Sequence, residues 1–196
     1  IYNPVITADL DQQAKQPTGE PWLDEKTTQV ILGGGRLVGK KRLQDLVAVF
    51  SELRKTRKLR LVIFGTGRER SRLERQVRDL GLDDAVLFTG WTPNPYAYMA
   101  RADVFVLSSE REGAPSVLVE ALACGCPVVS TDCPSGPREI LDGGVHGPLV
   151  PVGDRETLSR AITTTLDANP DPKTLRKSVA TFTAESAATQ YLAALF

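Results

Sequence analysis

Short apolar runs and longer amphipathic segments alternate along the chain. The apolar runs predict strands at residues 29–32, 60–64, 85–88, 103–107, 128–129 and 147–150. Apolar residues recurring every three or four positions predict helices at 43–57, 69–80, 95–102, 155–166 and between Pro115 and Gly125. Such alternation favours parallel strands joined by helical crossovers. We therefore expect an α/β fold, with a doubly wound and mostly parallel sheet.

Both ends of the chain lack this alternation. Residues 1–28 are polar and rich in turn formers, and we expect 9–27 to cross the surface as a loop. Residues 29–168 carry the strand–helix pattern and form the predicted domain. The run Asn169-Pro170-Asp171-Pro172 interrupts the chain. Helical patterns at 173–180 and 184–196 then predict a C-terminal helical tail over 169–196.

Glycines mark the loops that follow the predicted strands. They occur at 33–35, at Gly65 and at Gly90, and parallel α/β sheets bind ligands at the carboxyl ends of their strands. The dinucleotide fingerprint G-x-G-x-x-G fails because position 38 is valine, and a Walker loop fails because no Gly-Lys-Ser/Thr follows. The loops thus predict a ligand site on a Rossmann-like sheet without either motif.

Composition narrows the class of protein. The chain of 196 residues is long enough for one domain with a substantial core, and its formal charge of zero predicts no nucleic-acid partner. No apolar run approaches the roughly 20 residues that cross a membrane, and no signal-peptide pattern is evident. Cys124, Cys126 and Cys133 are accompanied by a single histidine, His146. We therefore expect buried thiols in a reducing cytoplasm, and no metal site.

The stretch 110–131 concentrates the candidate chemistry. Pro115 suits a first helical turn and Gly125 a C-terminal cap. The N-terminus of the intervening helix offers N–H groups to a phosphate. Glu112 before the helix and Glu120 within it bracket this anion site. A phosphate cradle flanked by acceptors for hydroxyl groups suits a sugar nucleotide.

This stretch resembles a known family. Glu112 and Glu120 have seven residues between them, and Ala-Leu-Ala-Cys-Gly-Cys-Pro-Val-Val-Ser-Thr-Asp follows. Both features are similar to the retaining glycosyltransferases of the GT-B fold, family 4, also called group 1. The run Gly35-Arg36-Leu-x-x-x-Lys41 resembles that family's Gly-Arg-Leu-x-x-x-Lys. The resemblance covers the chain from its first residue through at least Leu166 and matches the C-terminal, donor-binding half of such enzymes.

The resemblance implies a role for each matching position. Glu112 would contact the transferred sugar, Arg36 and Lys41 would hold the donor diphosphate, and Glu120 would bind the ribose hydroxyls. Glu112, Arg36 and Lys41 are the expected catalytic residues. The expected donor-binding residues are Gly34, Gly35, Gly65, Gly90, Trp91, Gly113, Ser116, Val117 and Glu120. The donor would be a nucleotide sugar, with UDP as its nucleotide, and no metal or other cofactor would be required.

The same resemblance sets the expected partners. Residues 1–28 would include the linker to an N-terminal domain that binds a glycan or lipid-linked acceptor and is absent from this sequence. The chain begins without methionine, so we expect a fragment that cannot complete transfer alone. We expect the full enzyme in the cytoplasm, in polysaccharide biosynthesis, with peripheral membrane association open. Ala114-Pro115 replaces the family's usual aromatic residue and glycine, which removes one N–H and reshapes the sugar side.

Several alternatives remain open from the sequence. The chain could be a non-catalytic nucleotide-binding module, with Glu112 a surface carboxylate, or a dinucleotide dehydrogenase domain. Arg36 and the lysines near it could form a solvated basic turn, and Trp91 could lie in the core. His146 could be a general base, although nothing nearby would orient it. The arginines of 68–78 could line a nucleic-acid groove, but interleaved acidic residues favour a solvated, salt-bridged face.

Overall fold

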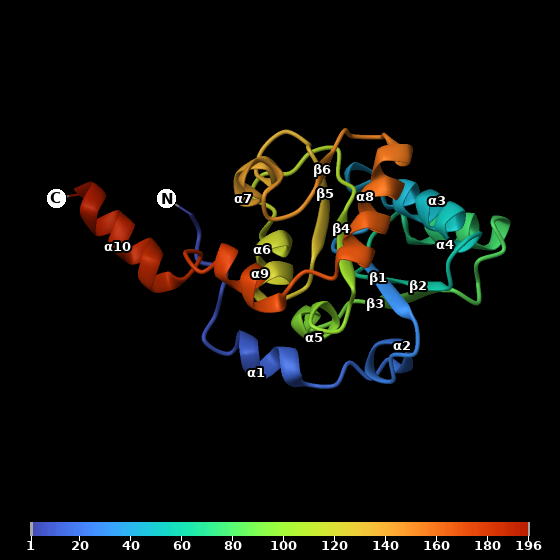
Figure 1. The fold of residues 1–196 in the computed structure, drawn as a ribbon, viewed down its shortest axis with the longest axis horizontal. Helices are drawn as coiled ribbons and strands as arrows, with labels where there is room; N and C mark the ends of the chain where they lie inside the picture. The colour runs from blue at the N-terminus through green and yellow to red at the C-terminus, as the bar shows by residue number, and fades with distance from the viewer. Residues whose placement is uncertain (1, 196) are drawn as a thin grey trace.

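The computed structural model describes residues 2–195, and these contain a sheet of six parallel strands (Figure 1). The strands are β1 (Gln29–Gly34), β2 (Leu59–Phe64), β3 (Val86–Gly90), β4 (Val104–Leu107), β5 (Val128–Thr131) and β6 (Leu149–Val150). Their order is β3-β2-β1-β4-β5-β6, with every neighbouring pair parallel. The predicted doubly wound α/β fold is confirmed, and its winding direction changes between β1 and β4.

Helices cover both faces of this sheet. One face carries α3 (Leu43–Arg54), α4 (Arg70–Asp79) and α8 (Arg155–Ala168). The other carries α1 (Leu10–Lys15), α2 (Pro21–Asp24), α5 (Pro95–Met99), α6 (Ser116–Ala123), α7 (Pro137–Ile140) and α9 (Pro172–Ser178). Alternate strand residues enter the two cores: Ile31 packs under α3, whereas Val30 and Leu32 point to the opposite face.

The segment 9–27 is not the surface loop that its polar composition predicted. It contains α1 and α2, whose Leu10 and Leu23 are buried in the same core as Met99, on the α6 side of the sheet. Each helix is too short for its apolar residues to show a repeat, so docking on the sheet decides the structure. Smaller differences occur elsewhere: β1 continues two residues beyond 32, and α3 ends at Arg54 instead of 57.

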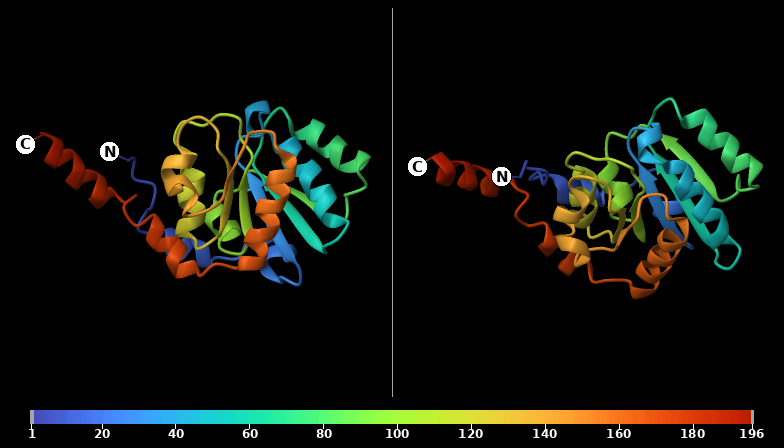
Figure 2. Two further views of the ribbon diagram at one scale, coloured as in Figure 1. Left: turned by 45° about the horizontal axis from the view of Figure 1, so that its top comes forward. Right: turned by 90° about the horizontal axis from the view of Figure 1, so that it is seen from above.

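The two ends of the described chain meet on the α6 side of the sheet. The N–H groups of Val5 and Ile6 both donate to the Phe182 carbonyl at 2.9 Å, and Ile6 bridges to Thr183. The C-terminal segment contains α9 and α10 (Ala184–Leu195), and α10 extends away from the sheet (Figure 2). Among the helices of residues 2–195, none combines the length and apolar character needed to cross a bilayer.

Asp45 ties α3 to α8, and its removal has a predictable cost. Its carboxylate is 3% exposed and accepts from Arg42 Nε and from Arg155 Nη2, each at 2.7 Å. Asp45→Ala removes these charge-assisted bonds, so we expect the free energy of unfolding to fall by about 2–3 kcal/mol. Urea denaturation measures the change. Asp167→Ala, which breaks a more exposed pair with Arg57, should cost less than about 1 kcal/mol; equal losses would contradict this.

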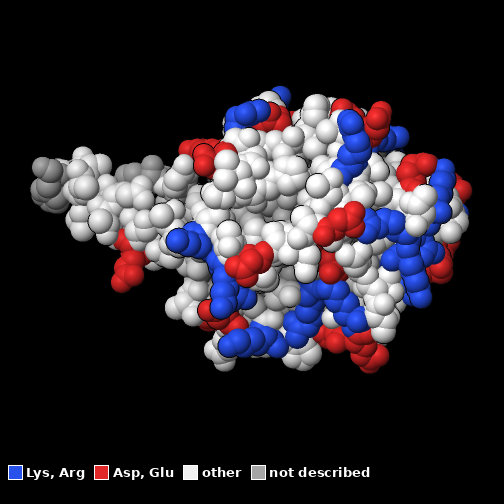
Figure 3. Space-filling model, viewed as in Figure 1, with Lys and Arg blue, Asp and Glu red and all other residues white. Residues whose placement is uncertain are grey.

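The arginine-rich helix α4 carries the salt-bridged face that its sequence predicted. Arg70 Nε lies 2.7 Å from Glu74, and Arg72 lies 3.4 Å from Glu69. Basic and acidic side chains are interspersed across the molecular face in Figure 3. Two of the four arginines of α4 are therefore paired with acidic side chains of the same helix or its N-cap.

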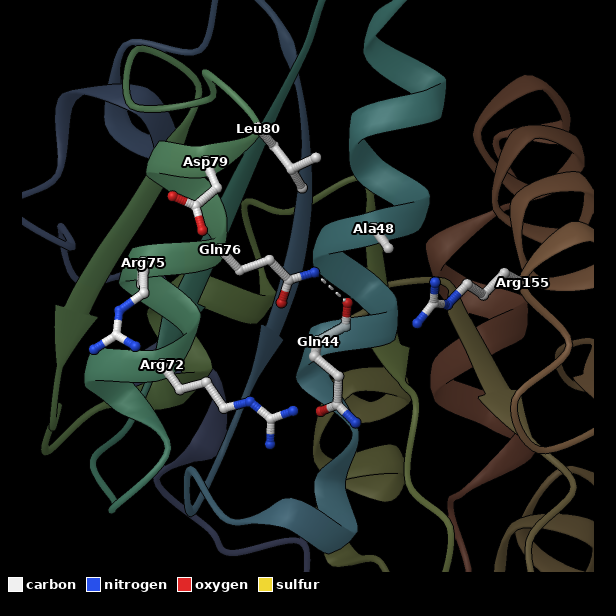
Figure 4. A pocket seen from close by; sticks show the side chains of 8 residues that line it. All are labelled: Gln44, Ala48, Arg72, Arg75, Gln76, Asp79, Leu80 and Arg155. Carbon is white, nitrogen blue, oxygen red and sulfur yellow. Dashed lines mark hydrogen bonds between the residues drawn. The ribbon is translucent and has the colours of Figure 1, made fainter.

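A groove of about 560 Å³ lies between α3, α4 and α8 (Figure 4). Arg72, Arg75 and Arg155 line it, and at its floor Gln76 Nε2 donates to the Gln44 carbonyl at 2.9 Å. These residues come from the helical layer over one face of the sheet. None of them lies in the loops that follow the strands, so the groove is separate from the predicted ligand site.

Candidate functional site

The loops after β1, β2 and β3 interlock at the carboxyl edge of the sheet. The Gly65 N–H donates to the Gly90 carbonyl at 2.5 Å, and the Gly35 N–H donates to the Phe64 carbonyl at 3.1 Å. A Cβ atom on Gly65 would lie 1.9 Å from the Gly35 carbonyl oxygen, so only glycine permits this approach. Three of the four loops expected at the site are therefore held together by their own backbones.

The glycines at the end of β1 serve two purposes. A Cβ on Gly33 would lie 2.6 Å from the Leu46 side chain, and one on Gly34 would lie 2.5 Å from the Phe64 ring. These two glycines are therefore required by packing inside the protein. Gly35 differs, because its φ is +111° and a Cβ there would face Lys41 at 3.9 Å. The part of Gly34 in ligand binding stays a prediction.

An ion pair joins the β1 loop to the β4 loop. Lys41 Nζ lies 2.6 Å from Glu112 Oε1, and the Ser109 hydroxyl donates to the same oxygen at 2.5 Å. The Lys41 and Glu112 side chains are 15% and 9% exposed. Within residues 2–195, Oε2 accepts no hydrogen bond, and no buried side-chain oxygen there lacks a partner. Oε2 therefore reaches solvent and can accept a hydroxyl group of a ligand.

The two cations expected at the site have different surroundings. Lys41 is neutralised by Glu112, whereas Arg36 is exposed and makes no ion pair within the described chain. Lys40 is also exposed and unpaired within that range. The structure thus brings Lys41 and Glu112 together and leaves Arg36, five residues before Lys41, exposed and without an ion pair within the described chain. A ligand diphosphate would meet one fixed and one adjustable cation.

The N-terminus of α6 presents backbone donors. The Ser116 N–H donates to the Ala114 carbonyl at 2.8 Å, so it is already occupied. The N–H groups of Gly113, Ala114 and Val117 have no acceptor within residues 2–195. Pro115 contributes none. Of the two amides predicted to hold a phosphate, Val117 alone remains available, and the Gly113 and Ala114 amides join it.

Glu120 lies one turn into α6, where it is partly buried. Burial raises the pKa of its carboxyl above the ordinary value, and a hydrogen bond from the Ser116 hydroxyl opposes that change. Its negative charge also helps to raise the pKa of Tyr96 on α5, so the two side chains are near neighbours. An acceptor kept partly away from water is suited to discriminate between hydroxyl groups.

The raised pKa of Glu120 predicts that its charge lowers the stability of the fold at neutral pH. Because folding favours the protonated carboxyl, its stabilising effect is present at low pH and is lost as the pH rises through the folded-state pKa. Glu120→Gln, which carries no charge, should therefore raise the midpoint of thermal unfolding at pH 7 relative to the wild type and leave it nearly unchanged at pH 4. A larger gain at pH 4 than at pH 7 would contradict this.

Trp91 does not lie in the core. Its side chain is 72% exposed directly after Gly90, which excludes the core alternative and leaves the predicted contact with a base open. Arg70, interpreted from sequence as part of a solvated helix face, instead borders this turn. Its Nη2 donates to the Phe88 carbonyl at 3.4 Å, and its Nη1 lies 3.4 Å from a Cβ placed on Gly90.

Sequence reasoning missed three buried hydroxyl residues at this edge. Ser108 and Ser109 follow β4, and Thr131 ends β5; each is 3% exposed or less. The sequence does contain a signal for the two serines: they directly follow an apolar strand, at the start of the loop that contains Glu112. The loop 132–136 closes the wall beside them, since a Cβ on Gly136 would lie 2.3 Å from Pro115.

His146 and the cysteines lie outside this constellation. His146 lines a cavity of about 380 Å³ with Pro127 and Pro148, next to the amino ends of β5 and β6. The amino ends form the opposite edge of a parallel sheet, so His146 is not placed to act with Glu112. Cys124, Cys126 and Cys133 are buried and unbonded, as predicted. Burial raises the pKa of the Cys124 thiol to about 12.

Together these groups can bind a dianion and polar hydroxyl groups. Arg36, Lys41 and the α6 amides offer positive charge and N–H donors, while Glu112 and Glu120 offer acceptors on either side. Within residues 2–195, no cluster of histidine, cysteine and acidic side chains is arranged to hold a metal ion. The binding groups supplied by the chain are therefore its own cations, amides and carboxylates.

Comparison with known proteins gives a family and a fold. Residues 18–181 match the sequence family described as glycosyl transferases group 1. The N-acetylgalactosamine-N,N'-diacetylbacillosaminyl-diphospho-undecaprenol 4-alpha-N-acetylgalactosaminyltransferase of Campylobacter jejuni is 34% identical over 167 residues. That match covers 85% of this chain and 44% of the Campylobacter protein.

Solved structures show the same fold. The lipopolysaccharide outer core galactosyltransferase WaaB superimposes with a TM-score of 0.80 at 25% identity, over 100% of this chain and 54% of WaaB. HepE of Anabaena in complex with UDP has a TM-score of 0.75 at 23% identity, over 93% of this chain and 55% of HepE. The present chain spans about half the length of these proteins.

Proposed function

The chain belongs to the family of group 1 glycosyl transferases, and from this we propose that its site binds a nucleotide sugar, with UDP as the nucleotide. The chain then acts as the donor-binding half of a retaining, metal-independent glycosyltransferase. The observation that carries this proposal is the Lys41–Glu112 pair, held at the carboxyl edge between the Gly35 loop and the start of α6. Arg36 and the α6 amides supply positive charge and N–H donors for a diphosphate, and Glu112 and Glu120 supply acceptors for the hydroxyl groups of two sugars.

Each part of the donor then has a partner. The diphosphate lies between Lys41, Arg36 and the Val117 amide, where positive charge and N–H donors gather. Glu112 Oε2 accepts from a hydroxyl of the transferred sugar, and Glu120 accepts from the ribose. The base lies against Gly90 and Trp91. The UDP complex of HepE, whose fold is similar, supports UDP as the nucleotide.

Leaving-group stabilisation is the main catalytic contribution in this proposal. When the bond between the sugar C1 and the diphosphate oxygen breaks, negative charge develops on the diphosphate. Lys41, Arg36 and the α6 amides lie ready to stabilise it, which is the largest single contribution in many enzymes. Glu112 fixes the sugar for attack by the acceptor, and the anomeric configuration is retained. The proton of the acceptor hydroxyl passes to the departing diphosphate oxygen, so no residue of this chain is required as a general base.

The acceptor completes the proposed reaction outside this chain. The name of the Campylobacter relative identifies a lipid-linked glycan acceptor, and WaaB is named for lipopolysaccharide. We accordingly assign a hexose-type sugar and a glycan or lipid-linked acceptor to the whole enzyme, acting in the cytoplasm and at its membrane surface. Acceptor binding requires a second domain, joined ahead of the docked helix α1, so this chain alone binds donor without sustained transfer.

Calorimetric titration of this chain with UDP, GDP and ADP tests the proposed donor site. We expect UDP to bind at least about tenfold more tightly than the other two, since a base edge left unpaired costs about 1–3 kcal/mol. The affinity should be the same with Mg²⁺ and with EDTA. NADH is titrated beside the three nucleotides, and its binding in preference to all of them would favour a dehydrogenase domain. A requirement for Mg²⁺ would overturn metal independence.

A further inference from the structure

Two adjacent serines, Ser108 and Ser109, follow β4, and the proposed function gives neither of them a contact with the donor. Ser109 is 0% exposed and Ser108 is 3% exposed, although a polar side chain is costly to bury without a partner. Each hydroxyl bonds one residue of the Lys41–Glu112 ion pair. Ser109 donates to the Glu112 carboxylate, and Ser108 donates to the Lys41 backbone carbonyl at 2.8 Å. We propose that Ser109 and Ser108 are positioning residues that separately fix the sugar-binding carboxylate and the diphosphate-binding lysine.

Ser109 determines which oxygen of Glu112 is left for a ligand. Its hydroxyl and the Lys41 ammonium both lie on Oε1, at 2.5 and 2.6 Å, while Oε2 reaches solvent. Two donors on one oxygen restrain rotation of the carboxylate, which a lysine on a flexible stem cannot do alone. Removing the hydroxyl leaves the charge of Glu112 in place and releases its orientation.

The backbone of Ser109 is itself anchored. The Thr131 hydroxyl on the neighbouring strand donates to the Ser109 carbonyl at 2.5 Å. This bond fixes the donor before any ligand is present, so the orientation of Glu112 is set by the sheet and not by its exposed loop. Hydrogen bonds thus run from Thr131 on β5 to Ser109 after β4 and from Ser109 to the Glu112 carboxylate, so the carboxylate is oriented before a ligand binds.

Ser108 acts on the other member of the pair. Its hydroxyl donates to the Lys41 carbonyl. Two residues later, the Glu110 N–H donates to the carbonyl of the preceding lysine, Lys40, at 2.8 Å. The short turn Gly39–Lys41 is thus fastened to β4 through its backbone. Loss of the Ser108 hydroxyl shifts the base of the lysine side chain, and with it the charge offered to a diphosphate.

This inference rests on the proposed donor site, and two ligands separate it from that proposal. UDP probes the nucleotide contacts alone, whereas UDP-galactose and UDP-N-acetylgalactosamine add the sugar contact with Glu112. The ratio between the affinity for a UDP-sugar and that for UDP isolates the sugar contact. A change in general stability moves both affinities and leaves the ratio unchanged.

We would titrate the wild-type chain, Ser109→Ala, Ser109→Thr and Ser108→Ala with UDP and with both UDP-sugars. Ser109→Ala should keep the affinity for UDP within about twofold and lower the ratio by about tenfold, the effect of one lost hydrogen bond to a charged group. Ser109→Thr, which keeps the hydroxyl, should restore the ratio. Ser108→Ala should weaken UDP and both UDP-sugars together, by about tenfold.

Ser130→Ala is the matched control, because this buried serine on β5 donates to the Thr131 carbonyl and not to the ion pair. It should leave the ratio unchanged. An unchanged ratio in Ser109→Ala, in a wild-type chain that binds UDP, would overturn the positioning role and leave the donor site standing. Failure of the wild type to bind UDP or either UDP-sugar would overturn the proposed function, and this inference with it.

Discussion

Replacing Lys41 with alanine is expected to weaken the binding of UDP by about tenfold to a hundredfold and to lower the free energy of unfolding by about 1–3 kcal/mol. The loss of stability comes from Glu112, whose side chain is 9% exposed and has its only described counter-charge in Lys41. The loss of affinity comes mainly from the missing ammonium, which is the proposed partner of the diphosphate. Without the ammonium, an uncompensated carboxylate faces the incoming diphosphate. Calorimetry with UDP and urea denaturation measure the two effects on the same preparation.

The chain contains matched controls for this prediction. Lys40→Ala removes the adjacent lysine, which is exposed and makes no ion pair within residues 2–195, so it should change stability by less than about 0.5 kcal/mol. The double variant Lys41→Ala/Glu112→Gln removes both charges and should recover most of the lost stability while UDP binding stays weak. If Lys40→Ala were the more damaging substitution, the arrangement described here would be wrong.

In the longer transferase proposed above, replacing Glu112 with glutamine is expected to lower the rate of sugar transfer by at least about a hundredfold. The amide keeps the shape of the side chain but loses the charge that, in the proposal, orients the sugar in the transition state. UDP should bind this chain as tightly as before or more tightly, because Lys41 is released to the diphosphate.

Measuring kcat for transfer beside the dissociation constant of UDP distinguishes this from general damage. Glu139→Gln provides the comparison, since that carboxylate lies on α7 and accepts from the exposed Tyr2 hydroxyl. It should transfer sugar at close to the wild-type rate. Wild-type kcat in Glu112→Gln would instead support a non-catalytic nucleotide-binding module.

The strand–helix alternation was sufficient to predict the fold. Strands β2 and β4 and helices α3, α6 and α8 occur within a few residues of their predicted places, because each has an apolar repeat long enough to recognise. Asp154 caps the helix predicted from residue 155, with its side chain accepting from the Thr157 N–H at 2.9 Å. The short helices α1 and α2 were missed because docking on the sheet, and not local pattern, makes them helical.

The site was predictable as a set of loops but not as a set of contacts. Parallel topology required the glycine loops and Glu112 to share one edge, and they do. The pairing of Lys41 with Glu112, 71 positions apart, depends on which loops the sheet order places next to each other. β1 and β4 are neighbours only across the change of winding direction. The roles of Ser108 and Ser109 follow from that adjacency, so they could be seen only in three dimensions.

In the proposed function, the carboxyl edge of this sheet binds the uridine nucleotide of a sugar donor. Calorimetric titration of UDP into the wild-type chain and into Glu120→Ala tests it most directly, with Glu110→Ala, a more exposed carboxylate at the same edge, as the control. We expect Glu120→Ala to weaken binding by about 1–3 kcal/mol, the effect of unpaired ribose hydroxyls, and Glu110→Ala to leave it unchanged. Equal UDP affinity in the wild type and Glu120→Ala would show that Glu120 does not bind the ribose and would overturn the donor site as assigned.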